Sequence, residues 1–198
     1  MNEEKLLTAN TLQEDLQFWK HRLAGAESLQ LDLPFDRPRP SLRTIKSGCV
    51  QFELGREIEQ GLEQWQKQTR STRFMVLMAS AQLLLHKVSQ TQMTDICVGS
   101  LVANRYRPEL EPLIGMFANT LVYRSTIDPN RSFGDFQMQV KATSQKMLEH
   151  SNVPIDLLVR ELMKDKSGTS SPFFQVTLRD ETDLLSTQLK LGQDVKTT

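Results

Sequence analysis

Few side chains of this sequence have the types and spacing that metal binding or covalent catalysis requires. The three histidines, His21, His86 and His150, lie far apart, and none has a second histidine or a cysteine at metal-ligand spacing. The two cysteines, Cys49 and Cys97, are too few for a disulfide framework or a four-cysteine zinc site. Each cysteine lies in an apolar stretch, so we expect both to be buried, reduced thiols. His86 falls within an apolar run, which favours a hydrogen-bonded structural role over a catalytic one.

Motifs for phosphate binding and for an activated nucleophile are also missing from the sequence. It contains no Gly-x-x-x-x-Gly-Lys-Ser/Thr loop and no Gly-x-Gly-x-x-Gly turn. A Gly-x-Ser-x-Gly nucleophile elbow is absent as well, although Gly99 and Ser100 resemble part of one. Taken alone, these residues describe an α/β domain to which no chemistry is assigned.

Length and composition exclude further classes. The chain has 198 residues, of which 24 are Lys or Arg and 24 are Asp or Glu, and this neutrality argues against sequence-independent nucleic-acid binding. No apolar run reaches the roughly 18–20 residues that cross a bilayer. The first five residues lack the basic-then-apolar order of a secretory signal. We therefore expect a soluble, cytoplasmic, globular chain.

Four segments show the periodicity of helices. Apolar residues recur at helical spacing over 11–24, 56–69, 73–89 and 133–150, and a short helix is expected after Pro154. The 73–89 segment is apolar nearly all round, so it should lie in the middle of the fold. Ser132 and Asp135 have the spacing of a short capping box. Gly25 ends the first helix, where a left-handed conformation suits glycine.

Strands are expected between these helices. Residues 50–54 alternate apolar and polar side chains, which predicts a strand with one buried face. Residues 96–102, 120–127 and 173–178 also have the composition of strands. Three prolines make 33–40 an extended connector, and beyond Arg179 the pattern fades into a frayed or partly disordered end. The class is mixed α and β, and periodicity alone gives neither topology nor function.

One segment of the sequence carries a recognisable signature. Residues 114–124 read Ile-Gly-Met-Phe-Ala-Asn-Thr-Leu-Val-Tyr-Arg. This run resembles the Ile-Gly-x-Phe-Val-Asn-Thr-x-x-x-Arg signature of condensation domains from nonribosomal peptide synthetases. Upstream, residues 95–105, Asp-Ile-Cys-Val-Gly-Ser-Leu-Val-Ala-Asn-Arg, resemble the strand and Asn-Arg loop that precede this signature in the family.

Three further segments resemble the same family in the same order. Residues 150–156, His-Ser-Asn-Val-Pro-Ile-Asp, are similar to its His-Gln-Asp-Val-Pro-Phe-Glu segment. Residues 165–176, Asp-Lys-Ser-Gly-Thr-Ser-Ser-Pro-Phe-Phe-Gln-Val, resemble the Arg-Asp-x-Ser-x-x-Pro-Leu-Phe-Gln-Val region that follows. Phe-Trp-Lys at 18–20, Leu-Ala-Gly-Ala at 23–26 and Leu-Pro-Phe-Asp-Arg-Pro-Arg-Pro at 33–40 match the linker into the family's second lobe. The resemblance covers about residues 11–178.

The resemblance implies a fold like that of chloramphenicol acetyltransferase. Such a fold has two similar lobes, each a sheet flanked by helices, that face one another across a tunnel. Carrier-protein-bound thioesters enter from opposite ends, and the acceptor amine attacks the donor thioester to form a peptide bond. Family catalysis is associated with His-His-x-x-x-Asp-Gly on the first lobe, and no adjacent histidine pair occurs in this sequence.

The chain therefore resembles the second lobe only, as a mixed sheet flanked by helices. We expect an N-terminal helix and proline-rich linker over 1–40, the C-terminal lobe of a condensation domain over 41–178, and a poorly defined tail over 179–198. The implied partners are a peptidyl or aminoacyl carrier protein and a first lobe in cis or in trans. No cofactor is expected to bind directly, although the phosphopantetheine arm of the carrier is implied. The alternatives are a non-catalytic carrier-binding module and a truncated product without independent activity.

By resemblance, five residues are candidates for lining the tunnel: Asn104, Arg105, Gly115, Asn119 and Arg124. The Asn119 amide either points into the tunnel or bonds its own backbone at a strand entrance. Arg124 either crosses the lobe interface to a carboxylate or faces solvent. The Asn104–Arg105 loop is either tunnel floor or an ordinary turn, and Gly115 either admits a close approach or serves the loop.

The role of His150 also has two possible interpretations. It aligns with a family position, and it also lies near a helix end, where a cation suits the helix dipole.

Overall fold

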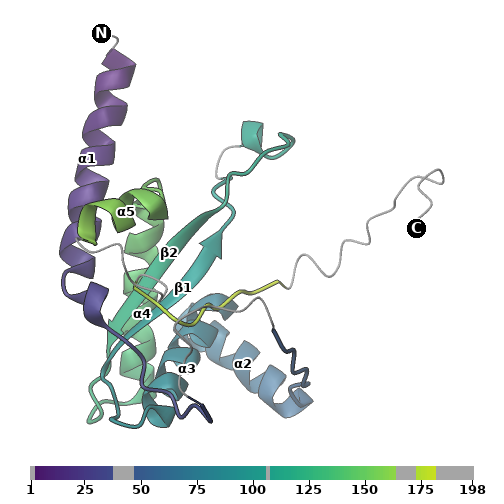
Figure 1. Cartoon of the computed structure of the whole chain (residues 1–198). Helices are drawn as coiled ribbons and strands as arrows, with labels where there is room; N and C mark the ends of the chain where they lie inside the picture. The colour runs from purple at the N-terminus through teal and green to yellow at the C-terminus, as the bar shows by residue number, and fades with distance from the viewer. Residues whose placement is uncertain (1–2, 38–46, 106–107, 164–172, 182–198) are drawn as a thin grey trace, which may run out of the picture.

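The computed structural model describes residues 3–37, 47–105, 108–163 and 173–181 (Figure 1). In chain order the elements are α1 (Glu3–Leu23), η1 (Ala26–Ser28), α2 (Arg56–Thr69), α3 (Arg73–Val88), β1 (Asp95–Val102), η2 (Pro108–Leu110), β2 (Asn119–Thr126), α4 (Phe133–Glu149) and α5 (Ile155–Leu162). Parts of the predicted connector, of the 165–176 motif and of the C-terminal tail lie outside the described residues. No helix in the described ranges combines the length and the apolar character that a membrane span needs.

The sheet of the described residues is a single antiparallel pair of strands, with one isolated parallel bridge beside it in place of the predicted mixed sheet. Strands β1 and β2 pair from Asp95 opposite Thr126 to Val102 opposite Asn119. On the other side of β1, Gly99 forms a parallel bridge with Thr177, through two backbone hydrogen bonds of 2.9 Å. Residues 176–178 therefore lie beside Gly99, where the yellow trace of segment 173–181 passes β1 in Figure 1. Of the strand predicted at 173–178, only this bridge is formed.

The helices enclose one apolar core against the two strands. Helix α3 packs on α4 and on β1, while α4 and α5 contact β2 and α1 lies against α5. The largest fully buried apolar side chains come from every layer of this arrangement: Trp19, Leu23, Met78, Ile96, Leu121, Met147, Leu158 and Phe173. The mixed fold of helices and a small sheet agrees with the predicted class.

Local signals fix the helix ends. The Ser132 hydroxyl accepts a hydrogen bond from the Asp135 amide at 3.2 Å and donates one to the Asp135 carboxylate at 2.7 Å, which confirms the predicted capping box. Gly25 follows α1 with φ +78°, the left-handed conformation expected of it. Helix α1 begins at Glu3, several residues before the predicted start.

Two sequence predictions are wrong for the same segment. Residues 50–54 form no strand, and Val50 and Phe52 are 88% and 81% exposed. Cys49 is exposed rather than buried, whereas Cys97 is buried as predicted. Alternation of apolar and polar residues indicates which face of a strand is apolar, but a strand forms only where another strand pairs with it. Among the described residues, none pairs with this segment.

Helix α3 lies less deeply than its composition predicts. One side of it is buried, including Met78 and Ala79, but Leu84 is 61% exposed and Val88 is also exposed. Within this helix His86 is buried and its Nδ1 lies 2.9 Å from the Met93 carbonyl oxygen. His86 is therefore the structural histidine that the sequence indicated.

Candidate functional site

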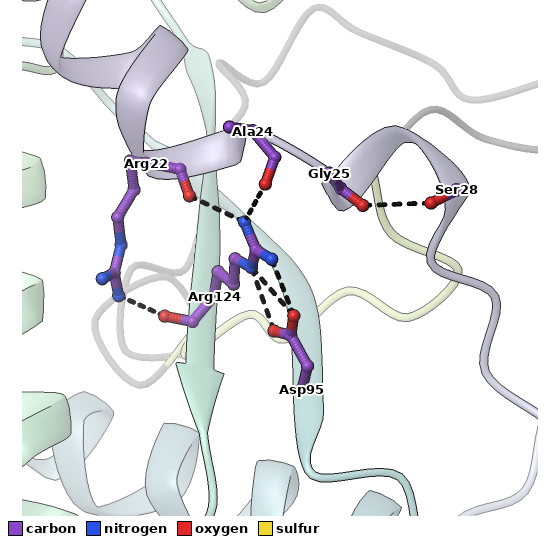
Figure 2. A network of polar contacts seen from close by, with 6 residues as sticks. All are labelled: Arg22, Ala24, Gly25, Ser28, Asp95 and Arg124. Atoms are coloured by element: carbon purple, nitrogen blue, oxygen red, sulfur yellow. Dashed lines mark hydrogen bonds and ion pairs between the residues drawn. The ribbon is translucent and has the colours of Figure 1, made fainter.

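Arg124 is the centre of the densest polar network around the sheet (Figure 2). Its Nε lies 2.9 and 3.2 Å from the two carboxylate oxygens of Asp95, and its Nη2 lies 2.7 Å from Oδ2. Its Nη1 donates to the carbonyl oxygens of Arg22 at 3.1 Å and Ala24 at 2.8 Å. These bonds satisfy two carbonyls at the C-terminal end of α1 that have no partner within the helix. Arg124 therefore ties α1 to the β1–β2 pair.

The electrostatics of this network follow from its geometry. The hydrogen bonds and charge of Asp95 raise the pKa of Arg124, and they outweigh its partial burial. Burial raises the pKa of the neighbouring Cys97 thiol to about 12, so this thiol is neutral at physiological pH. The sequence predicted that Arg124 either reaches a carboxylate across the lobe interface or faces solvent. Within the chain it instead binds the carboxylate of Asp95 on the adjacent strand.

Asn119 uses all four hydrogen-bonding positions of its side-chain amide. Its Nδ2 donates to the carbonyl oxygens of Ser151 and Val153, both at 2.8 Å. Its Oδ1 accepts from the backbone amides of Thr120 at 2.8 Å and Ile155 at 3.2 Å. An amide side chain offers two N–H donors and two acceptor lone pairs, and all are taken here. Asn119 thereby fixes the turn between α4 and α5 onto the start of β2.

The loop between the strands is organised by Arg105. Its guanidinium lies 4.3 Å from the centre of the Phe117 ring and donates to the Gly115 carbonyl at 3.1 Å and to the Leu110 carbonyl. A Cβ on Gly115 would lie 3.0 Å from the Phe117 ring, so glycine lets the ring approach closely. Asn104, beside Arg105, has φ +53°, in the left-handed region.

This loop encloses an open hollow and presents apolar side chains around it. The hollow measures about 560 Å³ and is lined by residues from the two arms of the loop: Ala103, Arg105, Ile114, Gly115, Met116, Phe117 and Ala118. Ile114 and Met116 are fully exposed, at 105% and 96%. In Figure 1 the loop projects from the body of the molecule beyond the ends of β1 and β2.

The structure thus places the five predicted residues in different parts of the loop and of β2. Arg105 and Gly115 lie together in the loop, with Asn104 adjacent, and Asn119 stands where the loop enters β2. Arg124 lies five residues further along β2, about 16 Å from Asn119 at the rise of an extended strand. Whether these residues line a tunnel stays a prediction.

His150 belongs to a separate cluster that joins α4 to α1. Its Nδ1 lies 2.6 Å from Oδ1 of the buried Asp15, and its ring stacks on Phe18 with 4.0 Å between centroids. The indole N–H of Trp19 donates to its carbonyl oxygen at 2.7 Å. The structure gives His150 a structural role at the end of α4, in place of a free cation on the helix dipole.

Asp15 and Asp95 are the functional-looking residues that sequence reasoning missed. Asp15 falls within the apolar stripe of α1, and a charged residue in such a stripe signals a buried partner. Asp95 opens a buried strand, and its partner is 29 positions away. No group of three or more His, Cys, Asp or Glu side chains in the described ranges could hold a metal ion.

The packing of helices on a small antiparallel sheet is the fold of the chloramphenicol acetyltransferase-like class. The chain resembles holo-AB3403, a four-domain nonribosomal peptide synthetase, with a TM-score of 0.79 and 25% identity over 84% of this chain and 12% of that one. It also shares its fold with the X-domain from teicoplanin biosynthesis, with a TM-score of 0.76, over 88% of this chain and 39% of that one.

The chain belongs to the condensation-domain family, whose model matches residues 1–196. It is 38% identical over 174 residues to phosphinothricin tripeptide synthetase PhsC of Streptomyces viridochromogenes. It is 39% identical over 174 residues to a linear gramicidin synthase of Brevibacillus parabrevis. These alignments cover 88% of this chain but only 16% and 3% of the two relatives.

Proposed function

We propose that this chain is the second lobe of a nonribosomal peptide synthetase condensation domain. Together with a first lobe it forms an amide bond between two carrier-bound substrates. The acceptor amine attacks the donor thioester carbonyl, the carbon–sulfur bond breaks, and the amine proton leaves for a base while the pantetheine thiol is released. The histidine expected to act on that proton is not encoded in these residues, so it comes from another segment, in cis or in trans.

The observation that carries the two-lobe proposal is the exposure of large apolar side chains on two segments. Val50 and Phe52 are 88% and 81% exposed, and Ile114 and Met116 are exposed completely. A soluble domain seldom leaves such groups of side chains uncovered unless they contact a partner. We infer that segments 49–54 and 113–117 contact the first lobe and that the loop ordered by Arg105 contributes to the tunnel.

The experiment is reconstitution of the full chain with a separately produced first lobe that carries adjacent histidines. Donor and acceptor carrier proteins loaded with aminoacyl thioesters are added, and the dipeptidyl thioester is measured by mass spectrometry. We expect product only when both lobes are present, and none when the second histidine of the first lobe is replaced by alanine. Turnover by the chain alone at the same rate would contradict the proposal.

Surface variants locate the contact between the lobes. Ile114→Ser combined with Met116→Ser should abolish binding of the first lobe, because it removes apolar area from the proposed interface. Met138→Ser is the matched control, since Met138 is 46% exposed and belongs to α4 and to neither segment. Equal loss of binding in the control would contradict the placement of the interface.

A non-catalytic carrier-binding module is the second candidate, and the lack of an adjacent histidine pair favours it. That candidate predicts binding to a phosphopantetheinylated carrier protein and no product with any first lobe. The same reconstitution therefore separates the two proposals.

A further inference from the structure

A groove between α1 and α4 is lined by none of the five tunnel candidates. It measures about 330 Å³ and is lined by Phe18, His21 and Arg22 of α1 and by Gln139, Ala142, Thr143 and Lys146 of α4. Its volume is at the lower end of the range that small-molecule sites occupy, and such sites occur between packed helices. The aromatic ring of Phe18 and the methyl group of Ala142 supply apolar lining.

The charges around this groove have one sign. Arg22 and Lys146 each carry a positive charge, and none of the described residues that line the groove is acidic. Lys146 makes no ion pair with any described residue, and Lys20, the neighbour of His21, is already paired with Glu161 at 2.8 Å. An anion entering the groove would therefore meet positive charge from both helices.

Arg22 is the residue that most strongly indicates an anion in this groove. Its Nη2 donates to the carbonyl oxygen of Arg124, as Figure 2 shows, and this bond leaves its other N–H groups without a partner among the described residues. The nearby carboxylate of Asp95 is already held by three contacts to Arg124. Burial, and next the positive charge of Arg124, lower the pKa of Arg22. A half-buried cation beside a second cation is stabilised by a bound anion.

We propose that the α1–α4 groove binds a small amphiphilic anion, with a short acyl or aromatic body on Phe18 and Ala142 and a carboxylate between Arg22 and Lys146. Arginine donates in a planar fork that matches the two oxygens of a carboxylate, and lysine adds a mobile ammonium group. Because part of the lining is apolar, we expect a ligand with an apolar body to bind more tightly than one that carries only a negative charge. This site does not depend on a first lobe or on carrier proteins, so it stands or falls separately from the proposed function.

The test uses the full, ¹⁵N-labelled chain and sodium octanoate as the probe. Octanoate carries both features of the proposed ligand, 1-octanol carries only the apolar chain, and acetate carries only the charge. We expect saturable binding of octanoate, with a Kd at least about tenfold lower than that of either fragment. Amide shifts should be concentrated at residues 18–22 and 139–146. Shifts spread over the whole chain, or 1-octanol binding as tightly as octanoate, would overturn the proposal.

Three variants test the site without disturbing the Arg124 network. Ala142→Phe fills the groove from an exposed position and should abolish binding. Lys146→Gln should raise the octanoate Kd by about three- to tenfold, because it removes one cation. Lys87→Gln makes the same charge change on the exposed end of α3 and should leave the Kd unchanged. Binding that survives Ala142→Phe, or that falls equally in Lys87→Gln, would contradict the site.

Discussion

In strands β1 and β2 the side chains of Asp95, Asn119 and Arg124 are held by contacts within the chain, whereas segments 49–54 and 113–117 turn large apolar side chains toward solvent. Arg124 donates hydrogen bonds to Asp95 and to the end of α1, and the side-chain amide of Asn119 forms all its hydrogen bonds with backbone groups. Ile114 and Phe52, by contrast, are largely or completely exposed. Asn119 and Arg124, which the sequence offered as candidates for lining the tunnel, hold the helices on the strands, and the exposed apolar residues remain available to a partner.

The two cysteines provide the largest predicted difference between these regions. Cys49 lies in the exposed segment and Cys97 in β1. At pH 8 a pKa of about 12 leaves about one Cys97 thiol in ten thousand as the reactive thiolate, and burial also keeps reagents away from it, whereas Cys49 is exposed. We expect Cys49 to react with a disulfide reagent faster than Cys97 by a factor on the order of a thousand.

Absorbance during the reaction counts the fast thiols, and mass spectrometry of digested protein assigns them. Addition of urea should make both cysteines react rapidly, which serves as the control. Two thiols of equal rate in the folded chain would show that β1 is not protected in the way described.

Removal of the Arg124 side chain should produce the largest loss of stability. Arg124→Met leaves the Asp95 carboxylate without its partner and uncaps the end of α1, so we expect a loss of about 2–4 kcal/mol in the free energy of unfolding by urea. The matched control is Arg131→Met, because Arg131 and Asp128 are exposed and 3.7 Å apart. That variant should change stability by less than about 0.5 kcal/mol. Equal effects would contradict the distinction.

Asn119→Ala should lower the free energy of unfolding slightly less than Arg124→Met does. It leaves two carbonyl groups of the α4–α5 turn and the backbone amides of Thr120 and Ile155 without this partner, for an expected loss of about 2–3 kcal/mol. Asn152→Ala, at an exposed position in the same turn, should stay within about 0.5 kcal/mol of the parent. Urea unfolding of both variants checks this, and a neutral Asn119→Ala would show that the four bonds do not stabilise the fold.

Gly99→Ala should have the smallest effect of the stability variants. A Cβ at this position would lie 2.5 Å from the Phe174 ring, so this ring must shift, at about 1–2 kcal/mol. Gly61→Ala, in open space within α2, should instead stabilise the chain by about 0.5–1 kcal/mol. Thermal unfolding gives the sign of each change, and stabilisation by Gly99→Ala would contradict the packing of Phe174 on β1.

The elements that sequence reasoning predicted well are those whose signals are local. The bounds of α2 and the capping box of α4 follow from residues within one or two turns. The strand expected at 50–54 did not form, because its alternation says nothing about what pairs with it. Asp15 escaped notice because its partner His150 is 135 positions away. The amide of Asn119 was recognised as special, but its bonds to 151–155 depend on the tertiary fold.

Hydrogen exchange on the full chain, with and without a condensation-domain first lobe, tests the central claim most directly. The amides of paired residues in β1 and β2 should exchange slowly in both samples, since their hydrogen bonds are made within the chain. Segments 49–54 and 113–117 should exchange rapidly in the chain alone and become protected when the first lobe is added. Unchanged, rapid exchange of these segments in the presence of a bound first lobe would contradict the account.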